Sequence, residues 1–230
     1  MPGSYDMNDE VVKKTPITDS GPEGSTQEGS TPDAPAGPAR ILVHMCCGPC
    51  SIIPLKSVLS GRAEVWGFFH NPNIHPRAEF LARLEAVRKL AGLLSLDVIY
   101  DEDYAPREFI MGLKRSSGDG SETQRHPEYG QRCVFCYSSR LEATARAAAE
   151  NGFTAFTSSL LYSRYQDHEE IRRLGAELAA RYGVLFHYED FRPGWQSGIE
   201  ASKEMGLYRQ KYCGCIYSKI ERYAKKKKRA

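Results

Sequence analysis

The cysteines of this sequence have the grouping expected of metal ligands or redox-active thiols. The chain has seven, an odd number, and they fall in three tight groups far apart in the sequence. An isolated free cysteine is usually a small buried hydrophobic residue. Here the cysteines are grouped in Gly- or Pro-containing loops and near predicted helix starts, which favours a chemical role. Such thiolates either ligate a soft metal or exchange electrons as a dithiol. The groups are Cys46-Cys47-Gly48-Pro49-Cys50, Cys133-Val134-Phe135-Cys136 and Cys213-Gly214-Cys215.

The spacing within each group helps to separate these uses. Two residues lie between Cys133 and Cys136, which lets both sulfurs face one ion and fits zinc as well as an iron–sulfur cluster. Adjacent cysteines, as at Cys46 and Cys47, are less usual in structural zinc sites. The Cys213–Cys215 triplet differs from both, because a disulfide between residues two apart closes a small, strained ring that is easily reduced. The triplet therefore favours a reversible two-electron switch, with metal ligation as the alternative.

The elements that must position these groups follow from apolar periodicity. Strands alternating with helices predict an α/β fold with a mainly parallel sheet and helices on both faces, HUP- or Rossmann-like, with cysteine-bearing loops and C-terminal helices. In such sheets, functional residues gather after the carboxyl ends of strands, and Cys46 directly follows the first predicted strand. The predicted strands are 41–45, 64–69, 98–100, 153–157 and 184–188, and the predicted helices are 51–59, 76–94, 109–113, 137–150 and 167–182.

Composition divides the chain of 230 residues into three parts. Residues 1–39 hold seven acidic and two basic residues, are rich in Pro, Gly, Ser and Thr, and are predicted to be a disordered leader. Residues 40–224 are predicted to form one α/β domain, because 41% of the chain is hydrophobic and supports a packed core. Residues 225–230 are a basic tail, which is either a solvated terminus or a contact to RNA phosphates.

The same composition excludes several classes of protein. No apolar run reaches the ~18 residues of a membrane-spanning helix, and the N-terminus lacks the basic and apolar regions of a signal peptide. Seven grouped cysteines are also unlike the disulfide framework of a small secreted domain. We therefore expect a cytoplasmic protein in a reducing environment, without a membrane partner.

The residues that flank the cysteines resemble the QueH-type epoxyqueuosine reductases. The resemblance runs in order from about Ile41 to Tyr223 and leaves the leader and the basic tail outside it. It is specific, because all three cysteine groups lie in matching flanks. The matching segments are Ile41 to Cys50, Asn71 to Pro76, Arg132 to Tyr137, Thr157 to Ser163 and Leu207 to Ser218.

This resemblance implies an iron–sulfur oxidoreductase for the last step of queuosine formation in transfer RNA. The enzyme would reduce the epoxide of epoxyqueuosine at the wobble position to an alkene, independently of cobalamin, with electrons from an unidentified donor. The resemblance maps the ligands of a [4Fe–4S] cluster to Cys46, Cys47, Cys133 and Cys136, and a redox-active disulfide to Cys213 and Cys215. Cys50 is left over, and it would ligate a second iron, reach toward substrate or serve as a structural thiol.

Other polar residues carry weaker expectations. His44 is expected to be a hydrogen-bonded core histidine, and Asp167 the N-cap of a helix. The loop 162–166 is either solvated or contacts RNA, and the segment 208–212 mixes basic with aromatic groups that favour substrate contact.

Two functions from other classes fit the same residues. One is a zinc-stabilised RNA-binding module without catalysis, in which the cysteines are structural ligands. The other is a thiol–disulfide oxidoreductase, or a redox sensor, that acts on proteins. Iron and sulfide content separates the first from the reductase, and a requirement for transfer RNA separates the second.

Overall fold

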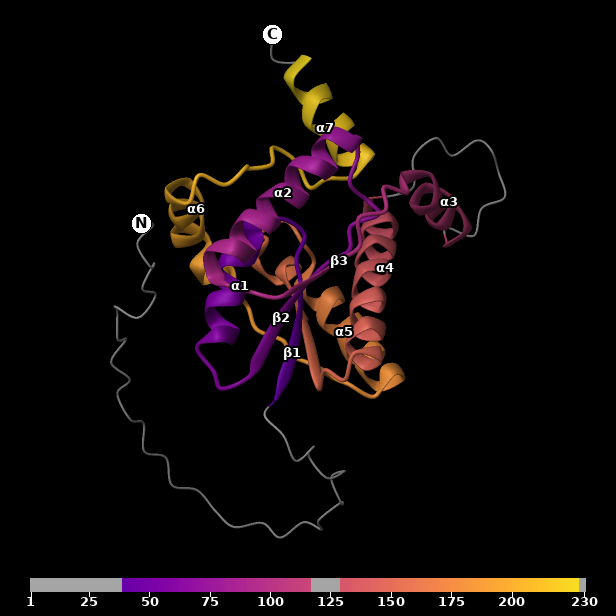
Figure 1. Cartoon of the computed structure of the whole chain (residues 1–230). Helices are drawn as coiled ribbons and strands as arrows, with labels where there is room; N and C mark the ends of the chain where they lie inside the picture. Colours follow the sequence, from indigo (N-terminus) through magenta and orange to yellow (C-terminus); the bar gives the residue numbers. More distant parts are fainter. Residues whose placement is uncertain (1–38, 117–128, 228–230) are drawn as a thin grey trace, which may run out of the picture. The chain divides into compact units, whose positions relative to one another are not determined.

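The computed structural model describes residues 39–116 and 129–227. Within these ranges five strands form one sheet in the order β3-β2-β1-β4-β5, and every neighbouring pair is parallel (Figure 1). β1 lies at the centre, where His44 pairs with Phe68 on one side and with Ser158 on the other. The predicted parallel α/β architecture is confirmed. The strands are β1 (Arg40–His44), β2 (Glu64–Phe69), β3 (Val98–Tyr100), β4 (Ala155–Ser158) and β5 (Leu185–Phe186).

Helices cover both faces of the sheet, and alternation along the strands separates the two cores. Leu42 packs in one core with residues of α4 and α5, whereas its neighbour Val43 packs in the other with residues of α1 and α2. Figure 1 shows these two helix pairs on opposite sides of the sheet. The α-helices are α1 (Gly48–Leu59), α2 (Arg77–Leu94), α3 (Pro106–Ser116), α4 (Tyr129–Glu150), α5 (His168–Tyr182), α6 (Trp195–Glu204) and α7 (Ile216–Lys227), and two short 3₁₀ helices are η1 (Ser159–Tyr162) and η2 (Arg192–Gly194).

The structure corrects several predicted boundaries: α1 begins at Gly48 rather than at 51, α3 spans Pro106–Ser116 rather than 109–113, and β4 spans Ala155–Ser158 rather than 153–157. The fifth strand is only Leu185–Phe186 instead of 184–188, because it lies at the edge of the sheet and has only β4 to pair with. Helix α4 begins at Tyr129 rather than at Tyr137, so Cys133 and Cys136 lie inside a helix and not before it. The first turns of α4 are held by packing against α3, where the rings of Phe109 and Phe135 lie 5.3 Å apart.

Parts of the predicted organisation lie outside the described residues. These are residues 1–38 of the predicted leader, residues 117–128 of the predicted domain, and residues 228–230 of the basic tail. The backbone of the first three tail residues continues α7, but their side chains are not described. None of the helices in the described ranges combines the length and the apolar character needed to cross a bilayer.

Candidate functional site

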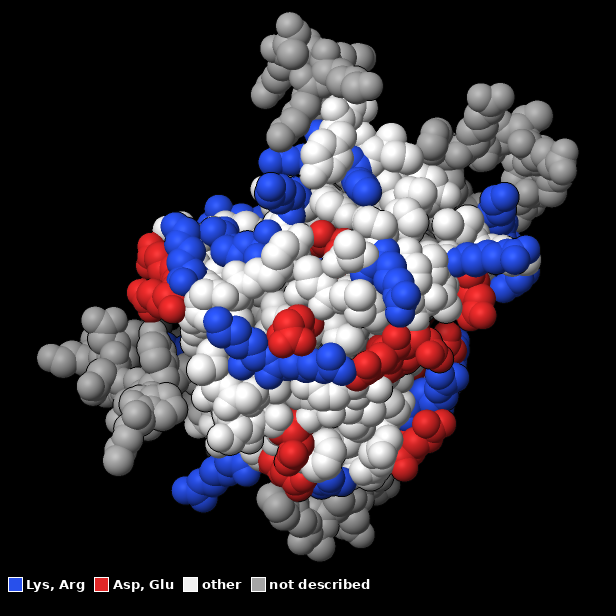
Figure 2. Space-filling model, turned by 45° about the horizontal axis from the view of Figure 1, so that its top comes forward, with Lys and Arg blue, Asp and Glu red and all other residues white. Residues whose placement is uncertain are grey.

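The cysteines gather at the carboxyl end of the sheet. From β1 the chain proceeds outward to β2 and β3, whereas from β4 it proceeds to β5 on the other side, so the strand order reverses between β1 and β4. Ligand sites of open parallel sheets lie at this reversal. Cys46 and Cys47 follow β1, and η1 follows β4. Figure 2 turns this end toward the viewer, and basic side chains predominate over acidic ones near the end of α7.

The first cysteine group forms a compact triad at the start of α1. The sulfurs of Cys46, Cys47 and Cys50 all lie within 4.8 Å of one another, and those of Cys46 and Cys47 are 3.8 Å apart. Two thiolates on one tetrahedral ion have about this separation, since metal–sulfur bonds are ~2.3 Å long. The backbone N–H of Cys46 donates to Ser159 Oγ at 2.9 Å, and Cys47 is the N-cap of α1. The triad is therefore fixed by β1, η1 and α1 together.

Shared hydrogen bonds make one thiol of the triad acidic. Hydrogen bonding with Cys47 and Cys50 lowers the pKa of Cys46 well below its usual range. Burial raises the pKa of Cys47, and hydrogen bonding to Cys46 raises that of Cys50. The guanidinium of Arg83 also favours negative charge on Cys47. A triad that holds negative charge beside a cation is suited to ligate a soft metal ion.

The other four cysteines line one small cavity of about 70 Å³, which also reaches Arg132 and Tyr137. Cys133 and Cys136 project from one face of α4, since they are three residues apart on a helix. Cys213 is exposed and Cys215 is buried just before α7, where the N–H of Ser218 donates to Cys215 Sγ at 3.4 Å. All seven cysteines are free thiols. The second and third cysteine groups of the sequence thus meet in space.

A buried arginine connects this cavity with the triad. Arg140 of α4 donates from Nη2 to Cys136 Sγ and from Nε to the Cys136 carbonyl, both at 3.1 Å. Burial raises the pKa of Cys136 to about 12, and the positive charge of Arg140 opposes this effect. The charges of Cys213 and Cys46 both act on Arg140. A buried cation is costly unless anions compensate it, and within the described residues sulfur is the only side-chain partner of Arg140.

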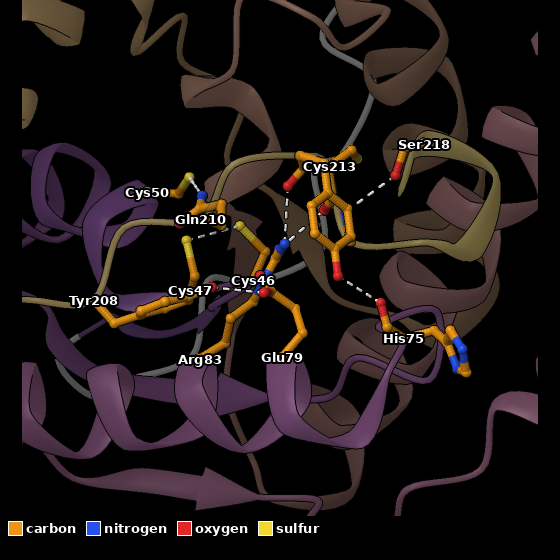
Figure 3. A network of polar contacts seen from close by, with 12 residues as sticks. Cys46, Cys47, Cys50, His75, Glu79, Arg83, Tyr208, Gln210, Cys213 and Ser218 are labelled. Atoms are coloured by element: carbon orange, nitrogen blue, oxygen red, sulfur yellow. Dashed lines mark hydrogen bonds and ion pairs between the residues drawn. The ribbon is translucent and has the colours of Figure 1, made fainter. Parts of the chain in front are cut away.

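A second buried arginine holds the loop that carries Cys213. Arg83 of α2 donates to the carbonyls of Tyr212 and Cys213 at 2.9 Å each, and its Nε donates to Glu79 at 2.8 Å (Figure 3). Gly214 has φ +131°, and a Cβ at this position would lie 3.1 Å from Nη1 of Arg83. The loop can therefore approach the arginine this closely only with glycine between the two cysteines.

Several residues that the sequence analysis singled out use their side chains for hydrogen bonds within the protein. His44 is the core histidine that the sequence predicts: Nδ1 lies 2.9 Å from Ser158 Oγ, and burial lowers its pKa to about 3, so the ring is neutral. In the 208–212 segment, Tyr208 donates to Glu79 at 2.6 Å and Tyr212 donates to the His75 carbonyl at 2.7 Å. These two hydroxyls position the loop. Asp167 caps α5 as predicted, accepting from the N–H of Glu170.

Sequence reasoning missed the two arginines that organise the cysteines. Arg83 lies on the buried face of α2, next to Leu84, and Arg140 lies next to buried Leu141. A charged residue within the apolar face of a predicted helix is a usable signal, because such a residue is almost never buried without a partner. The sequence does not reveal which partner it has.

Comparison with known proteins gives consistent matches. A family model described as epoxyqueuosine reductase QueH matches residues 41–221. The chain is 38% identical to the epoxyqueuosine reductase QueH of Thermotoga maritima, over 80% of this chain and 93% of that protein. Proteins of the same name from Dehalococcoides mccartyi and Haemophilus influenzae are 35% and 36% identical, over 81% of this chain and 96% and 74% of their own lengths.

A solved structure is also similar, at a greater distance. It is described as a predicted subunit of tRNA methyltransferase from Methanocaldococcus jannaschii, with a TM-score of 0.45 and 13% identity over 72% of this chain and 75% of that one. A similarity this distant carries no argument about function.

Proposed function

Because this chain belongs to the epoxyqueuosine reductase QueH family, we propose that it reduces the epoxide of epoxyqueuosine in transfer RNA to the alkene of queuosine. The change adds two electrons and two protons, and the epoxide oxygen leaves as water. Beyond the family, one observation carries the proposal: seven cysteines from three distant segments gather at one end of the sheet. The proposed setting is the cytoplasm, where thiols stay reduced.

We propose Cys46, Cys47, Cys133 and Cys136 as the ligands of a [4Fe–4S] cluster. The donor set is all thiol, as such clusters require, and three of the four residues are buried. Arg140 supports the assignment, because its charge acts on both pairs and would offset the negative charge of a cluster between them. When bound, the cluster would supply electrons one at a time. The proposal involves no cobalamin.

Cys50 is the proposed ligand of a second iron beside the cluster. Its sulfur lies within 4.8 Å of those of Cys46 and Cys47, and Gln210 Nε2 donates to it at 3.1 Å. The same compact triad also fits a zinc ion. This observation keeps a zinc-stabilised RNA-binding module as the second candidate function.

Cys213 and Cys215 are the proposed two-electron reductant. Two thiols that close to a disulfide release two electrons and two protons, which is what conversion of the epoxide to alkene and water consumes. Cys213 is exposed and accessible to substrate and to an electron donor, while Cys215 is buried next to it. Gln166 Nε2 donates to Cys213 Sγ at 3.4 Å, and Arg83 holds the backbone of the same residue.

Anaerobic purification followed by a turnover assay tests this function. We expect iron, acid-labile sulfide and broad visible absorption, and loss of one oxygen atom from epoxyqueuosine in transfer RNA once a reductant is supplied. A colourless zinc protein without sulfide or turnover would favour the RNA-binding module instead. Turnover of protein disulfides without any transfer RNA would favour a thiol–disulfide oxidoreductase.

A further inference from the structure

Next to the Cys213 cavity lies a group of aromatic and basic side chains, called here the Trp195 platform, in which Arg164 and Tyr165 are exposed and Trp195 is half-buried. The ring of Tyr165 meets that of Trp195 edge-on, with centroids 6.1 Å apart. The guanidinium carbon of Arg164 lies 5.4 Å from the centre of the indole. Tyr165 is 75% exposed, which is unusual for so large a ring in a structured loop.

The platform is rigid at its base. The buried ring of Tyr162 stacks on Trp195 with centroids 5.1 Å apart and an interplanar angle of 24°. Its hydroxyl also donates to the Trp195 carbonyl at 2.8 Å. On the loop itself, the N–H of Tyr165 donates to Ser163 Oγ at 3.2 Å. The ring of Tyr165 is therefore exposed to solvent and packs against a side chain, Trp195, that is itself held in place.

The platform is continuous with the proposed reaction site. Tyr165 and Gln166 line the same cavity as Cys213 and Cys215. Burial raises the pKa of Tyr162 to about 12, and the charges of Cys50, Arg209 and Arg164 act on the same hydroxyl. Arg164 belongs to the platform, and Arg209 directly precedes Gln210, whose side chain donates to Cys50 of the triad at 3.1 Å. Both arginines are exposed, and neither forms an ion pair within the described residues.

Exposed aromatic rings combined with unpaired arginines are the features that bind single-stranded nucleic acid. Bases stack on the rings and phosphates contact the guanidinium groups. Enzymes that modify one nucleotide act on single-stranded segments or extrude the nucleotide from its stack, and in both cases neighbouring bases have exposed faces. A fully paired RNA offers no free base faces, and a protein partner would not need cations directly beside the cavity.

We propose that the Trp195 platform binds an unpaired base of the anticodon loop adjacent to the reacting nucleotide, with Tyr165 as the stacking ring and Arg164 and Arg209 as phosphate contacts. This inference rests on the proposed function for the identity of the RNA. It adds the surface that holds the loop while the modified base enters the cavity.

Binding of an anticodon stem–loop RNA to the anaerobically purified protein tests the proposal. Stacking on an aromatic side chain contributes roughly 1–3 kcal/mol, so Tyr165→Ala should weaken binding by about 5- to 150-fold. Tyr165→Phe keeps the ring and should restore most of the affinity. Tyr188→Ala is the control, since Tyr188 is also an exposed tyrosine but does not line the cavity. A double Arg164→Gln, Arg209→Gln variant should flatten the salt dependence by about 0.7 per lost contact.

A fully paired RNA of the same length provides the comparison. Tyr165→Ala should leave its binding unchanged, because it offers no unpaired base. Unchanged stem–loop affinity in Tyr165→Ala, or an equal loss on the paired RNA, would overturn the platform. Iron content and turnover of the wild-type protein are measured in parallel. Wild-type protein that turns over epoxyqueuosine while Tyr165→Ala binds normally refutes only the platform, whereas wild-type protein without turnover refutes the proposed function itself.

Discussion

The segment Cys46–Cys50 holds three sulfurs within five residues, whereas the cavity beside it collects four sulfurs from α4 and from the loop before α7. The triad is built mainly by local structure: the end of β1 and the first turn of α1 hold its three residues, and one long-range hydrogen bond joins Cys46 to Ser159 of η1. Two of the three residues are buried. The cavity depends on tertiary contacts, above all on Arg83, which holds the backbone at Cys213. Its Cys213 is the only exposed cysteine of the seven.

This difference indicates that the two regions have different roles, metal binding in the triad and thiol–disulfide chemistry in the loop of Cys213 and Cys215. A rigid, buried set of thiols suits a permanently bound metal, because its geometry does not change during turnover. A dithiol must open and close, and it must be accessible to substrate and reductant. The exposed loop of Cys213 and Cys215 meets that need, while Cys133 and Cys136, the other two proposed cluster ligands, lie on α4 and line the same cavity as the dithiol.

The largest expected effect comes from the dithiol. Replacing Cys213 or Cys215 by Ser should abolish multiple turnover, because no disulfide can form, and leave iron and sulfide content at the wild-type level. The measurement is product formation over many cycles together with metal analysis. Loss of the cluster in either variant would make these residues ligands. Full turnover in either would show that the reaction needs no dithiol.

Substitutions at two glycines, one in each region, test the same comparison. At Gly48 a Cβ would lie 2.6 Å from the Ala86 carbonyl oxygen, so Gly48→Ala should force α1 away from α2 and destabilise the fold by about 1–3 kcal/mol. At Gly214 the φ of +131° is one that alanine rarely adopts, so Gly214→Ala should displace the exposed dithiol loop from Arg83 without moving α1 away from α2.

Thermal unfolding and turnover separate the two glycine variants. Gly48→Ala should lower the unfolding temperature, and Gly214→Ala should reduce turnover with little change in that temperature. If Gly214→Ala turned over at the wild-type rate, the geometry of the loop would not matter to the reaction.

The smallest expected effect concerns the basic tail. Removing residues 225–230 deletes five positive charges that lie outside both cysteine regions in the sequence. RNA affinity should fall, and the salt dependence of binding should flatten by roughly 0.7–0.9 per lost phosphate contact. Iron content and the chemical step should stay intact. An unchanged affinity and salt slope in the truncated protein would make the tail a solvated terminus.

Local features of this fold could be predicted from the sequence, and long-range ones could not. The bounds of β2 and β3 follow from short β-prone runs between turn residues, and Asp167 is legible as an N-cap. The start of α4 could not be predicted from the sequence, because Cys133 and Val134 are weak helix formers. Packing against α3 holds this part of the helix.

The same limit applies to the site. The Cys46–Cys50 triad lies in one stretch of sequence, so its proximity could be expected. The meeting of Cys136 with Cys213 could not, since 77 positions separate them and contacts of α4 and Arg83 bring them together. The resemblance to the family pairs Cys133 and Cys136 with Cys46 and Cys47, and that ligand set stays a prediction.

The most direct test asks whether Cys136 is a cluster ligand and Cys215 is not. It compares iron and acid-labile sulfide in anaerobically purified Cys136→Ser, Cys215→Ser and wild-type protein. Cys136 and Cys215 line the same cavity and are both buried, so the two substitutions are closely matched in environment. The account predicts that Cys136→Ser loses iron, sulfide and the broad visible absorption, while Cys215→Ser keeps all three. A Cys136→Ser protein with a full complement of iron and sulfide would contradict it.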